Sequence, residues 1–189
     1  MRRSTAECAR PCGPLRLSAA RLCLLLLVLL VSTAWAGEPR ELDWPALIPE
    51  GTPVVEPQLA PLHDLSQLSD ALSAESAPAA QQPAPDAPVV QALDGQAIKL
   101  PGYIVPLEVN EEGRTTEFLL VPYYGACIHV PPPPANQIVH IFSEMGVRVE
   151  DLYQPYWIEG TLKVAHSTSE LAASGYQMEA EKIYAYELK

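Results

Sequence analysis

The side chains with the clearest chemical potential lie in residues 125–137, which have the sequence GACIHVPPPPANQ. Within this segment a single residue separates Cys127 from His129. Where a chain is extended, residues two positions apart point to the same side. A thiolate and an imidazole on one side form a donor pair suited to zinc or copper(I). The spacing therefore predicts a metal-binding pair.

The residues that follow would hold this pair in place, because proline locks φ near about −65° and favours an extended polyproline II geometry. Four prolines occur in a row: Pro131, Pro132, Pro133 and Pro134. A closed zinc site needs four ligands. We expect His140 to be the third, because it lies on the strand that leaves the same loop. Candidates for the fourth are His63, His166, Glu108, Glu144, Glu150 and Asp151.

Two other interpretations of Cys127 stay open. A cysteine is among the most often buried residue types, so Cys127 could be an inert thiol of the core. Cys127, His129 and Asn136 also have the residue types of a cysteine hydrolase: nucleophile, base and orienting group. Three residues so close on one extended loop rarely reach that geometry, and the sequence offers no separate oxyanion hole. We therefore assign no catalytic residue and favour a binding protein over an enzyme.

A partner rather than a metal could also be bound by this loop. Tyr123 and Tyr124 flank it, and such aromatic side chains either line a ligand groove or close the end of a small β core. Asn136 and Gln137 are expected to bond backbone carbonyls in the proline run, because proline keeps its acceptor and lacks a donor. Together with the four prolines, these residues form the predicted contact surface.

The N-terminus, residues 1–36, has the features of a cleaved secretory signal. Arginines precede the apolar run at 22–31, and Ala34-Trp35-Ala36 supplies a small-x-small cleavage pattern. The run is about ten residues long, whereas a membrane-spanning helix needs about 20. We therefore expect export to the periplasm and no membrane span after cleavage. A lipoprotein is less favoured, because Cys23 follows Leu22 rather than a small residue.

Cleavage would change both the cysteine count and the charge. Three of the four cysteines lie in the signal, so Cys127 would remain without an internal disulfide partner. The signal also holds five of the 12 basic residues and one of the 23 acidic residues, which leaves 7 basic against 22 acidic residues, a net charge of −15. Nucleic acid is not an expected partner, because phosphate binding needs clustered lysine and arginine.

Residues 37–92 are predicted to form a Pro/Ala-rich acidic tether, because they contain ten of the 20 prolines and one basic residue, Arg40. Two islands interrupt it. The apolar residues around Trp44 and Pro45 are expected to dock on the chain's own domain. The leucines of 62–72 suggest one short amphipathic helix.

Residues 93–189 are predicted to form one compact β domain. Short β-rich runs bounded by turn residues predict five strands, at 96–109, 115–121, 137–142, 156–164 and 177–186. Ser167 and Glu170 have capping-box spacing and Gly175 can end a helix, so a short helix is expected at 167–175. The chain is thus mainly β: a small five-stranded, partly open barrel of the oligomer-binding type or a β-sandwich, with one short helix.

Several long segments resemble one bacterial exported family that is classed only as a domain of unknown function. They are LPGYIVPLE at 100–108, EFLLVPYYGACIHVPPPPANQIV at 117–139, YWIEGTLKV at 156–164 and GYQMEAEKI at 175–183. Family members look like periplasmic proteins or lipoproteins, and some are encoded beside macrolide-exporter-type transporter components or among zinc-starvation genes. The resemblance covers 93–188 and the island at 44–49. It implies no established reaction.

Taken together, these patterns favour an exported periplasmic accessory protein that binds a transition metal and serves an envelope transporter. Zinc is the preferred metal, held by Cys127, His129 and His140. The alternative is a metal-free binding module that contacts an envelope or transporter partner through the proline-rich loop. A cysteine-dependent enzyme is the lesser alternative.

Overall fold

The computed structural model describes residues 38–53, 81–127, 130–150 and 152–187, which belong to one compact unit. The predicted signal at 1–36 and the predicted leucine-rich helix at 62–72 lie outside the described residues. So do two of the proposed metal donors, His63 and His129, and the carboxylate of Asp151.

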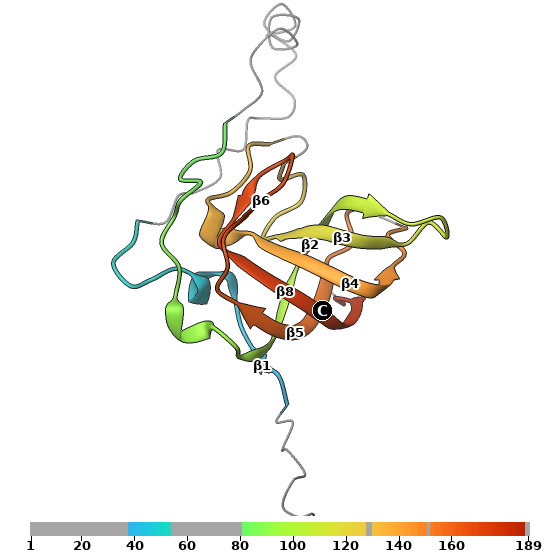
Figure 1. The fold of residues 1–189 in the computed structure, drawn as a ribbon, viewed down its shortest axis with the longest axis horizontal. Coiled ribbons are helices and arrows are strands. Elements are labelled where there is room, and N and C mark those ends of the chain that lie inside the picture. The colour runs from blue at the N-terminus through green and yellow to red at the C-terminus, as the bar shows by residue number, and fades with distance from the viewer. Residues whose placement is uncertain (1–37, 54–80, 128–129, 151, 188–189) are drawn as a thin grey trace, which may run out of the picture. The chain divides into compact units, whose positions relative to one another are not determined.

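Five strands close into a small barrel, as the sequence predicted (Figure 1). Its strands lie in the spatial order β2-β3-β4-β8-β5, and β5 pairs back with β2, so the barrel is closed rather than partly open. The β4–β8 pair is parallel and the other barrel pairs are antiparallel. The bounds are β2 Ala97–Val109, β3 Thr115–Val121, β4 Val139–Val147, β5 Tyr156–Lys163 and β8 Tyr176–Ala185.

Alternation along the strands sends one set of side chains into the barrel and the other set outward. The inner set is apolar and almost fully buried: it includes Ile98, Leu100, Phe118, Leu120, Ile141, Ile158, Leu162, Tyr176 and Met178. Two strands approach closely at Gly160, where a β-carbon would collide with the carbonyl oxygen of Glu179. The register of β5 against β8 shifts at the same place, between Glu159 and Gly160.

The N-terminal described segment packs on the barrel through both backbone and side chains. β1 (Arg40–Glu41) pairs in parallel with β2, and the 3₁₀ helix η1 (Trp44–Leu47) follows it. The indole nitrogen of Trp44 donates to the carbonyl of Pro101 at 2.7 Å, and Leu47 is fully buried. The island around Trp44 is therefore part of the barrel's core. The predicted domain boundaries at residues 36 and 92 stay predictions.

Residues 81–93 form a second covering segment, which ends in the 3₁₀ helix η3 (Gln91–Leu93). The amide of Gln82 donates to the carbonyls of Pro133 and Ala173, and its oxygen accepts from the backbone N–H of Ala173. These bonds tie the segment to the proline run on one side and to the chain before β8 on the other.

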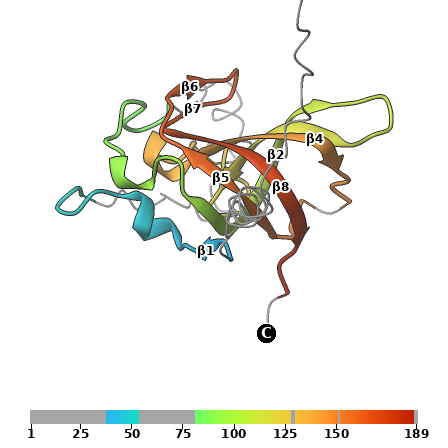
Figure 2. The same cartoon turned by 60° about the horizontal axis from the view of Figure 1, so that its bottom comes forward.

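The helix predicted at 167–175 is wrong, because these residues form a β-hairpin of β6 (Ser167–Thr168) and β7 (Ala173–Ser174). The hydroxyl of Ser169 accepts from the backbone N–H of Ala172 at 3.1 Å, which closes a turn instead of a helix. Serine side chains commonly compete with the helix in this way. Figures 1 and 2 place this hairpin and β1 at opposite sides of the barrel.

The 3₁₀ helix η4 (Ala135–Gln137) directly precedes β4. Among the described residues, no helix is long and apolar enough to cross a membrane.

Candidate functional site

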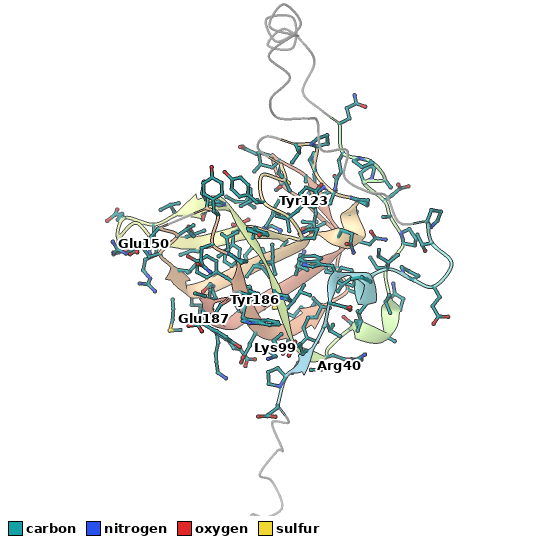
Figure 3. All side chains as sticks on the ribbon, turned by 180° about the vertical axis from the view of Figure 1, so that it is seen from behind. Arg40, Lys99, Tyr123, Glu150, Tyr186 and Glu187 are labelled. Carbon is teal, nitrogen blue, oxygen red and sulfur yellow. The ribbon has the colours of Figure 1, made fainter. Side chains whose placement is uncertain are left out.

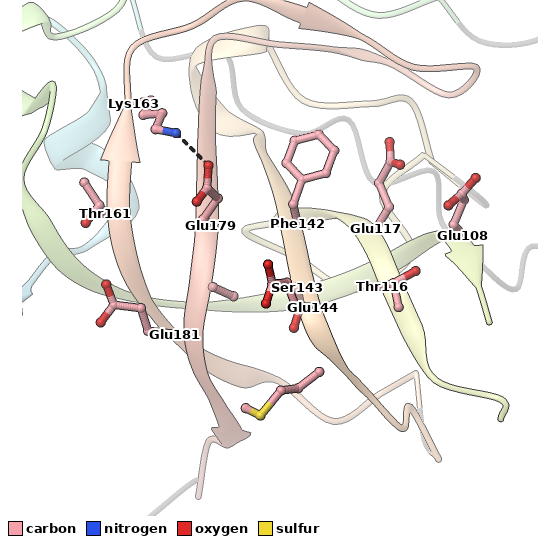
Figure 4. Close-up of a pocket in the computed structure, with 12 residues that line it drawn as sticks. Glu108, Thr116, Glu117, Phe142, Ser143, Glu144, Thr161, Lys163, Glu179 and Glu181 are labelled. Carbon is pink, nitrogen blue, oxygen red and sulfur yellow. Dashed lines mark hydrogen bonds and ion pairs between the residues drawn. The ribbon is translucent and has the colours of Figure 1, made fainter.

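A hollow with a volume of about 870 Å³ lies on the outer surface of the barrel (Figure 4). We call it the acidic groove. Residues from all five barrel strands line it, and five of them carry carboxylates: Glu108, Glu117, Glu144, Glu179 and Glu181. Lys163 is the basic side chain among its described lining residues.

The strand registers arrange part of this lining as a row that crosses the barrel surface. Glu108 lies opposite Glu117, which lies opposite Phe142, which in turn lies opposite Glu179. Figure 4 shows Phe142 between the two glutamates Glu117 and Glu179. Neighbouring strands lie about 4.8 Å apart, so the row from β2 to β8 spans roughly 14 Å. The groove is thus an extended surface feature.

Two side chains make the groove partly apolar. Phe142 is 38% exposed and Met145 is 72% exposed. Phe142 points outward because its neighbour Ile141 fills the inside of the barrel. At one side of the groove the ammonium of Lys163 lies 2.7 Å from Glu179, and this hydrogen bond lowers the pKa of that carboxyl.

His140 lies beside the groove and has both ring nitrogens occupied. Nε2 lies 2.8 Å from the carboxylate of Glu117, and Nδ1 lies 2.8 Å from the hydroxyl of Ser167. The ring centroid is 4.5 Å from that of Phe142. His140 is therefore engaged by protein groups, and in this arrangement neither nitrogen is available as the predicted third metal ligand.

Cys127 occupies a tight loop rather than an extended segment. Its backbone N–H donates to Val130 and the N–H of Val130 donates to Gly125, both at 3.1 Å. Cys127 has φ of 67°, in the left-handed region that residues with a β-carbon seldom adopt. The prediction that the side chains of Cys127 and His129 point to the same side assumed an extended backbone, and the backbone of Cys127 is not extended.

The thiol of Cys127 is partly buried against a set of apolar side chains outside the barrel core, which we call the outer cluster: Val105, Leu119, Val121, Ala126, Ile138 and Ala172. Burial raises the pKa of the thiol to about 11. Cys127 is therefore protonated near neutral pH, which disfavours both metal coordination and nucleophilic attack. Within the described part of the chain, no group of three or more His, Cys, Asp or Glu side chains could hold a metal ion.

The predicted contact surface is largely used inside the protein. Pro132, Pro133 and Pro134 are buried, whereas Pro131 is partly exposed and its carbonyl accepts from the Tyr123 hydroxyl at 3.2 Å. The proline run therefore packs within the fold and offers a partner little exposed surface.

Asn136 and Gln137 hold the two N-terminal segments to the barrel. The side-chain amide of Asn136 donates to the carbonyl of Pro88 at 2.9 Å, and that of Gln137 donates to the carbonyl of Trp44 at 2.9 Å. Both residues thus bond backbone carbonyls, as the sequence suggested, but these carbonyls belong to the covering segments.

Three tyrosines, one of them exposed, contact one another in sequence. Tyr124 stacks on Tyr153 with ring centroids 4.1 Å apart, and Tyr103 meets Tyr124 edge-on. Tyr153 is 67% exposed. Figure 3 labels Tyr123, with Tyr186 and Lys99 lower in the same view.

The acidic groove did not emerge from the sequence. From strand alternation alone, Glu117 could have been predicted to point outward from its strand, and Phe142 and Glu144 to point outward from theirs. It could not have shown that β8 lies beside β4, because that pairing joins strands about 30 residues apart through a parallel contact. His140 was noticed, but as a metal ligand rather than as the partner of Glu117 and Ser167.

Comparisons with known proteins agree with the expected resemblance to an uncharacterised family. No curated protein matches the chain. The fold is similar to the crystal structure of a DUF3299 family protein from Pseudomonas aeruginosa PAO1, with a TM-score of 0.67 and 60% sequence identity. That match covers 81% of this chain and 99% of the other. Residues 44–185 match the family described as a protein of unknown function, DUF3299. The chain therefore belongs to the DUF3299 family.

Proposed function

We propose that this protein is an exported accessory protein that holds a basic, extended segment of an envelope partner in the acidic groove. The observation that carries the proposal is the cross-strand row of Glu108, Glu117, Phe142 and Glu179. Glu108 and Glu117 are paired across β2 and β3 at an irregularity in the register, and like charges opposite each other destabilise a sheet. A bound cationic side chain would relieve this repulsion.

The apolar part of the groove supports the same conclusion. Exposed apolar side chains in a hollow rimmed by polar residues are typical of interaction sites. Met145 suits such a surface, because its side chain is flexible and polarizable. Phe142 and Met145 would contact the apolar parts of the bound segment, and the carboxylates would pair with its lysines or arginines.

The position of the groove on the fold is a third argument. Small barrels of the oligomer-binding type bind ligands over their second and third strands. In this chain those strands are β3 and β4, which carry Glu117, Phe142 and Met145. The surplus of carboxylates argues against a nucleic acid and for a basic protein segment.

The place of action and the partner class rest on the sequence. The N-terminal signal pattern supports export to the periplasm. The resembled family includes members encoded beside macrolide-exporter-type transporter components, which supports a transporter component as the partner. A segment of such a component that carries lysine or arginine beside apolar residues would fit the groove.

A defined peptide tests the proposal. The mature chain is titrated with a six-residue peptide of alternating lysine and leucine, and binding is followed by calorimetry. We expect the Glu108→Gln, Glu144→Gln double variant to bind about tenfold more weakly, because each exposed charge pair contributes up to about 1 kcal/mol. Met145→Ser should also weaken binding. Glu50→Gln, which removes a charge that does not line the groove, is the matched control.

The salt dependence gives a second readout from the same titration. Affinity should fall as ionic strength rises, since exposed charge pairs are screened within about 10 Å at 0.1 M salt. Equal binding by the wild type and the groove variants, or equal binding of a peptide of alternating glutamate and leucine, would refute the proposal.

A zinc centre at Cys127 and His129 is the second candidate. The observation in its favour is the left-handed backbone of Cys127, because strained residues cluster at functional sites. The raised pKa of the thiol and the engaged nitrogens of His140 oppose it. Metal content decides the question: one zinc per chain that is lost in Cys127→Ser would support the centre, and no bound zinc after purification with zinc would exclude it.

A further inference from the structure

Four polar side chains form a continuous hydrogen-bonded chain beside the acidic groove. Glu117 bonds Nε2 of His140 and Ser167 bonds Nδ1, both at 2.8 Å. The hydroxyl of Ser167 also lies 2.7 Å from that of Ser174. We call these residues the relay. None of them takes part in the peptide contacts that the proposed function requires, except Glu117, which lines the groove.

Either serine hydroxyl and either tautomer of the ring can donate in these bonds, and a neutral His140 ring beside an ionised Glu117 gives the following directions. A carboxylate of Glu117 can only accept, so Nε2 of His140 carries the proton and donates it. Nδ1 of the neutral ring is then an acceptor, and the hydroxyl of Ser167 donates to it. Ser167 has one hydroxyl proton, so Ser174 donates to Ser167. The result is a serine whose proton points at a base, with an acid that orients the base.

This is the arrangement that makes an alcohol oxygen nucleophilic: hydroxyl, imidazole and carboxylate in hydrogen-bonded order. Burial sharpens it. The His140 residue is 5% exposed and Ser174 is fully buried, whereas Ser167 is partly exposed. Of the two serines in the relay, Ser167 is thus the residue that is partly exposed to solvent.

The hairpin has an attachment that does not need the relay. Ala172, at its turn, packs into the outer cluster, and Gln82 bonds the backbone of Ala173 on both sides. Burying the imidazole of His140 and the hydroxyl of Ser174 is costly unless every polar atom is paired, and apolar side chains would hold the hairpin without that cost. The described side chains leave no buried polar atom unpaired, so the relay is complete.

We propose that Ser167 is a nucleophilic serine that accepts an acyl group from an ester. Phe142 packs on the ring of His140 and also lines the groove, so the apolar part of the ester would lie along Phe142. This is an activity in addition to the proposed peptide binding, and it uses the part of the groove lined by Glu117 and Phe142, both of which contact His140.

The chemistry balances with an ester and water as reactants. The hydroxyl oxygen of Ser167 bonds to the ester carbonyl carbon while its proton moves to Nδ1 of His140. The ester C–O bond then breaks, and the departing alkoxide takes that proton and leaves as an alcohol. Water attacks the acyl-serine by the same route, which releases a carboxylic acid and restores the serine. Glu117 accepts from Nε2 throughout and offsets the charge of the imidazolium.

A fluorophosphonate probe tests the proposal on the mature chain, with intact mass and peptide mapping as readouts. The fluoride leaves as the hydroxyl oxygen of Ser167 bonds phosphorus, so one adduct is expected on the peptide that contains Ser167. Ser167→Ala should abolish the adduct. His140→Gln should slow its formation about 100-fold or more, the usual contribution of a general base. Thr168→Ala, which removes an exposed hydroxyl one residue away, is the matched control and should leave the rate unchanged.

Folding is checked by thermal melting of each variant. Should His140→Gln melt below the labelling temperature, Glu117→Gln replaces it, because that change keeps the shape of the side chain and removes the charge that orients the ring. An adduct that is absent from the folded wild type, lies at another residue, or forms at the same rate without the imidazole or the carboxylate would overturn the proposal. The relay would then be a structural clamp for the hairpin.

Discussion

Tyr176 gives the sharpest test of how the N-terminal segments are held. Its side chain is fully buried, its hydroxyl donates to the carbonyl of Leu47 at 2.8 Å, and it accepts from the N–H of Val90 at 2.7 Å. Both partners belong to covering segments outside the barrel strands. Tyr176→Phe keeps the ring and leaves a buried carbonyl and a partly buried N–H unpaired. Each such group costs about 1–3 kcal/mol, so we expect a total loss near 3 kcal/mol.

Chemical denaturation of the mature chain measures this loss, and thermal melting gives an independent value. For a domain of about 150 residues, 1 kcal/mol corresponds to roughly 2–4 °C, so the melting temperature should fall by about 6–12 °C. The matched control is Tyr184→Phe, because that hydroxyl bonds Glu159 at the exposed surface. It should cost less than about 0.5 kcal/mol. Equal stability of Tyr176→Phe and the wild type would refute the view that these segments are part of the core.

Three further changes have expected outcomes. With a pKa of about 11, Cys127 should react with iodoacetamide at pH 7.5 roughly 300-fold more slowly than a free cysteine of pKa about 8.5. Its labelling rate should rise about tenfold for each pH unit up to about pH 11. Prompt labelling of the folded chain at pH 7.5 would contradict this. Gly160→Ala should lower the free energy of unfolding in denaturant by about 3 kcal/mol or more, because the added β-carbon collides with Glu179. The control Gly113→Ala has open space around its β-carbon but φ of 73°, so it should lower the free energy of unfolding by about 1 kcal/mol. Lys163→Met should raise the pKa of Glu179 toward its ordinary value in an NMR titration, because the hydrogen bond from Lys163 is what lowers it.

The same pKa shift at Cys127 predicts how stability depends on high pH. The folded state keeps the thiol protonated to about pH 11, whereas the unfolded chain loses this proton near its ordinary pKa, about 8.5. The unfolded state therefore gains stability relative to the folded state as pH rises between these values. Denaturation midpoints should fall over this range in the wild type and fall less in Cys127→Ala. Parallel curves for both proteins would contradict the assignment.

The strands of this barrel were predictable because their signal is local. Alternation of apolar and polar residues shows which side of a strand is buried, and turn residues such as Asp94-Gly95 and 111–113 mark strand ends. The hairpin at 167–175 was not predictable in this way. Ser167 and Glu170 have the spacing of a capping box, but the Ser167 hydroxyl bonds His140 and the neighbouring Ser169 bonds the backbone of the turn. Tertiary contacts overrode the local preference.

The candidate site was also predicted less well, because it too depends on tertiary contacts. The segment at 125–137 stood out by composition, yet the fold buries most of its prolines and uses Asn136 and Gln137 as internal donors. The left-handed conformation of Cys127 depends on the bonds between residues 125, 127 and 130, which no spacing rule contains. Glu117 and Phe142 belong to no recognisable sequence motif. They form part of a site only because the strands bring them together.

By itself, the sequence determined the β character of the domain, the acidity of its surface and the resemblance to an uncharacterised family, because composition and alternation are properties of neighbouring residues. Tertiary structure alone decided that the barrel closes, that β4 lies beside β8, and that Glu117, His140 and Ser167 meet. These contacts join residues 23 and 27 positions apart in the chain. Their geometry depends on strand order and register, which the packing of the whole core selects.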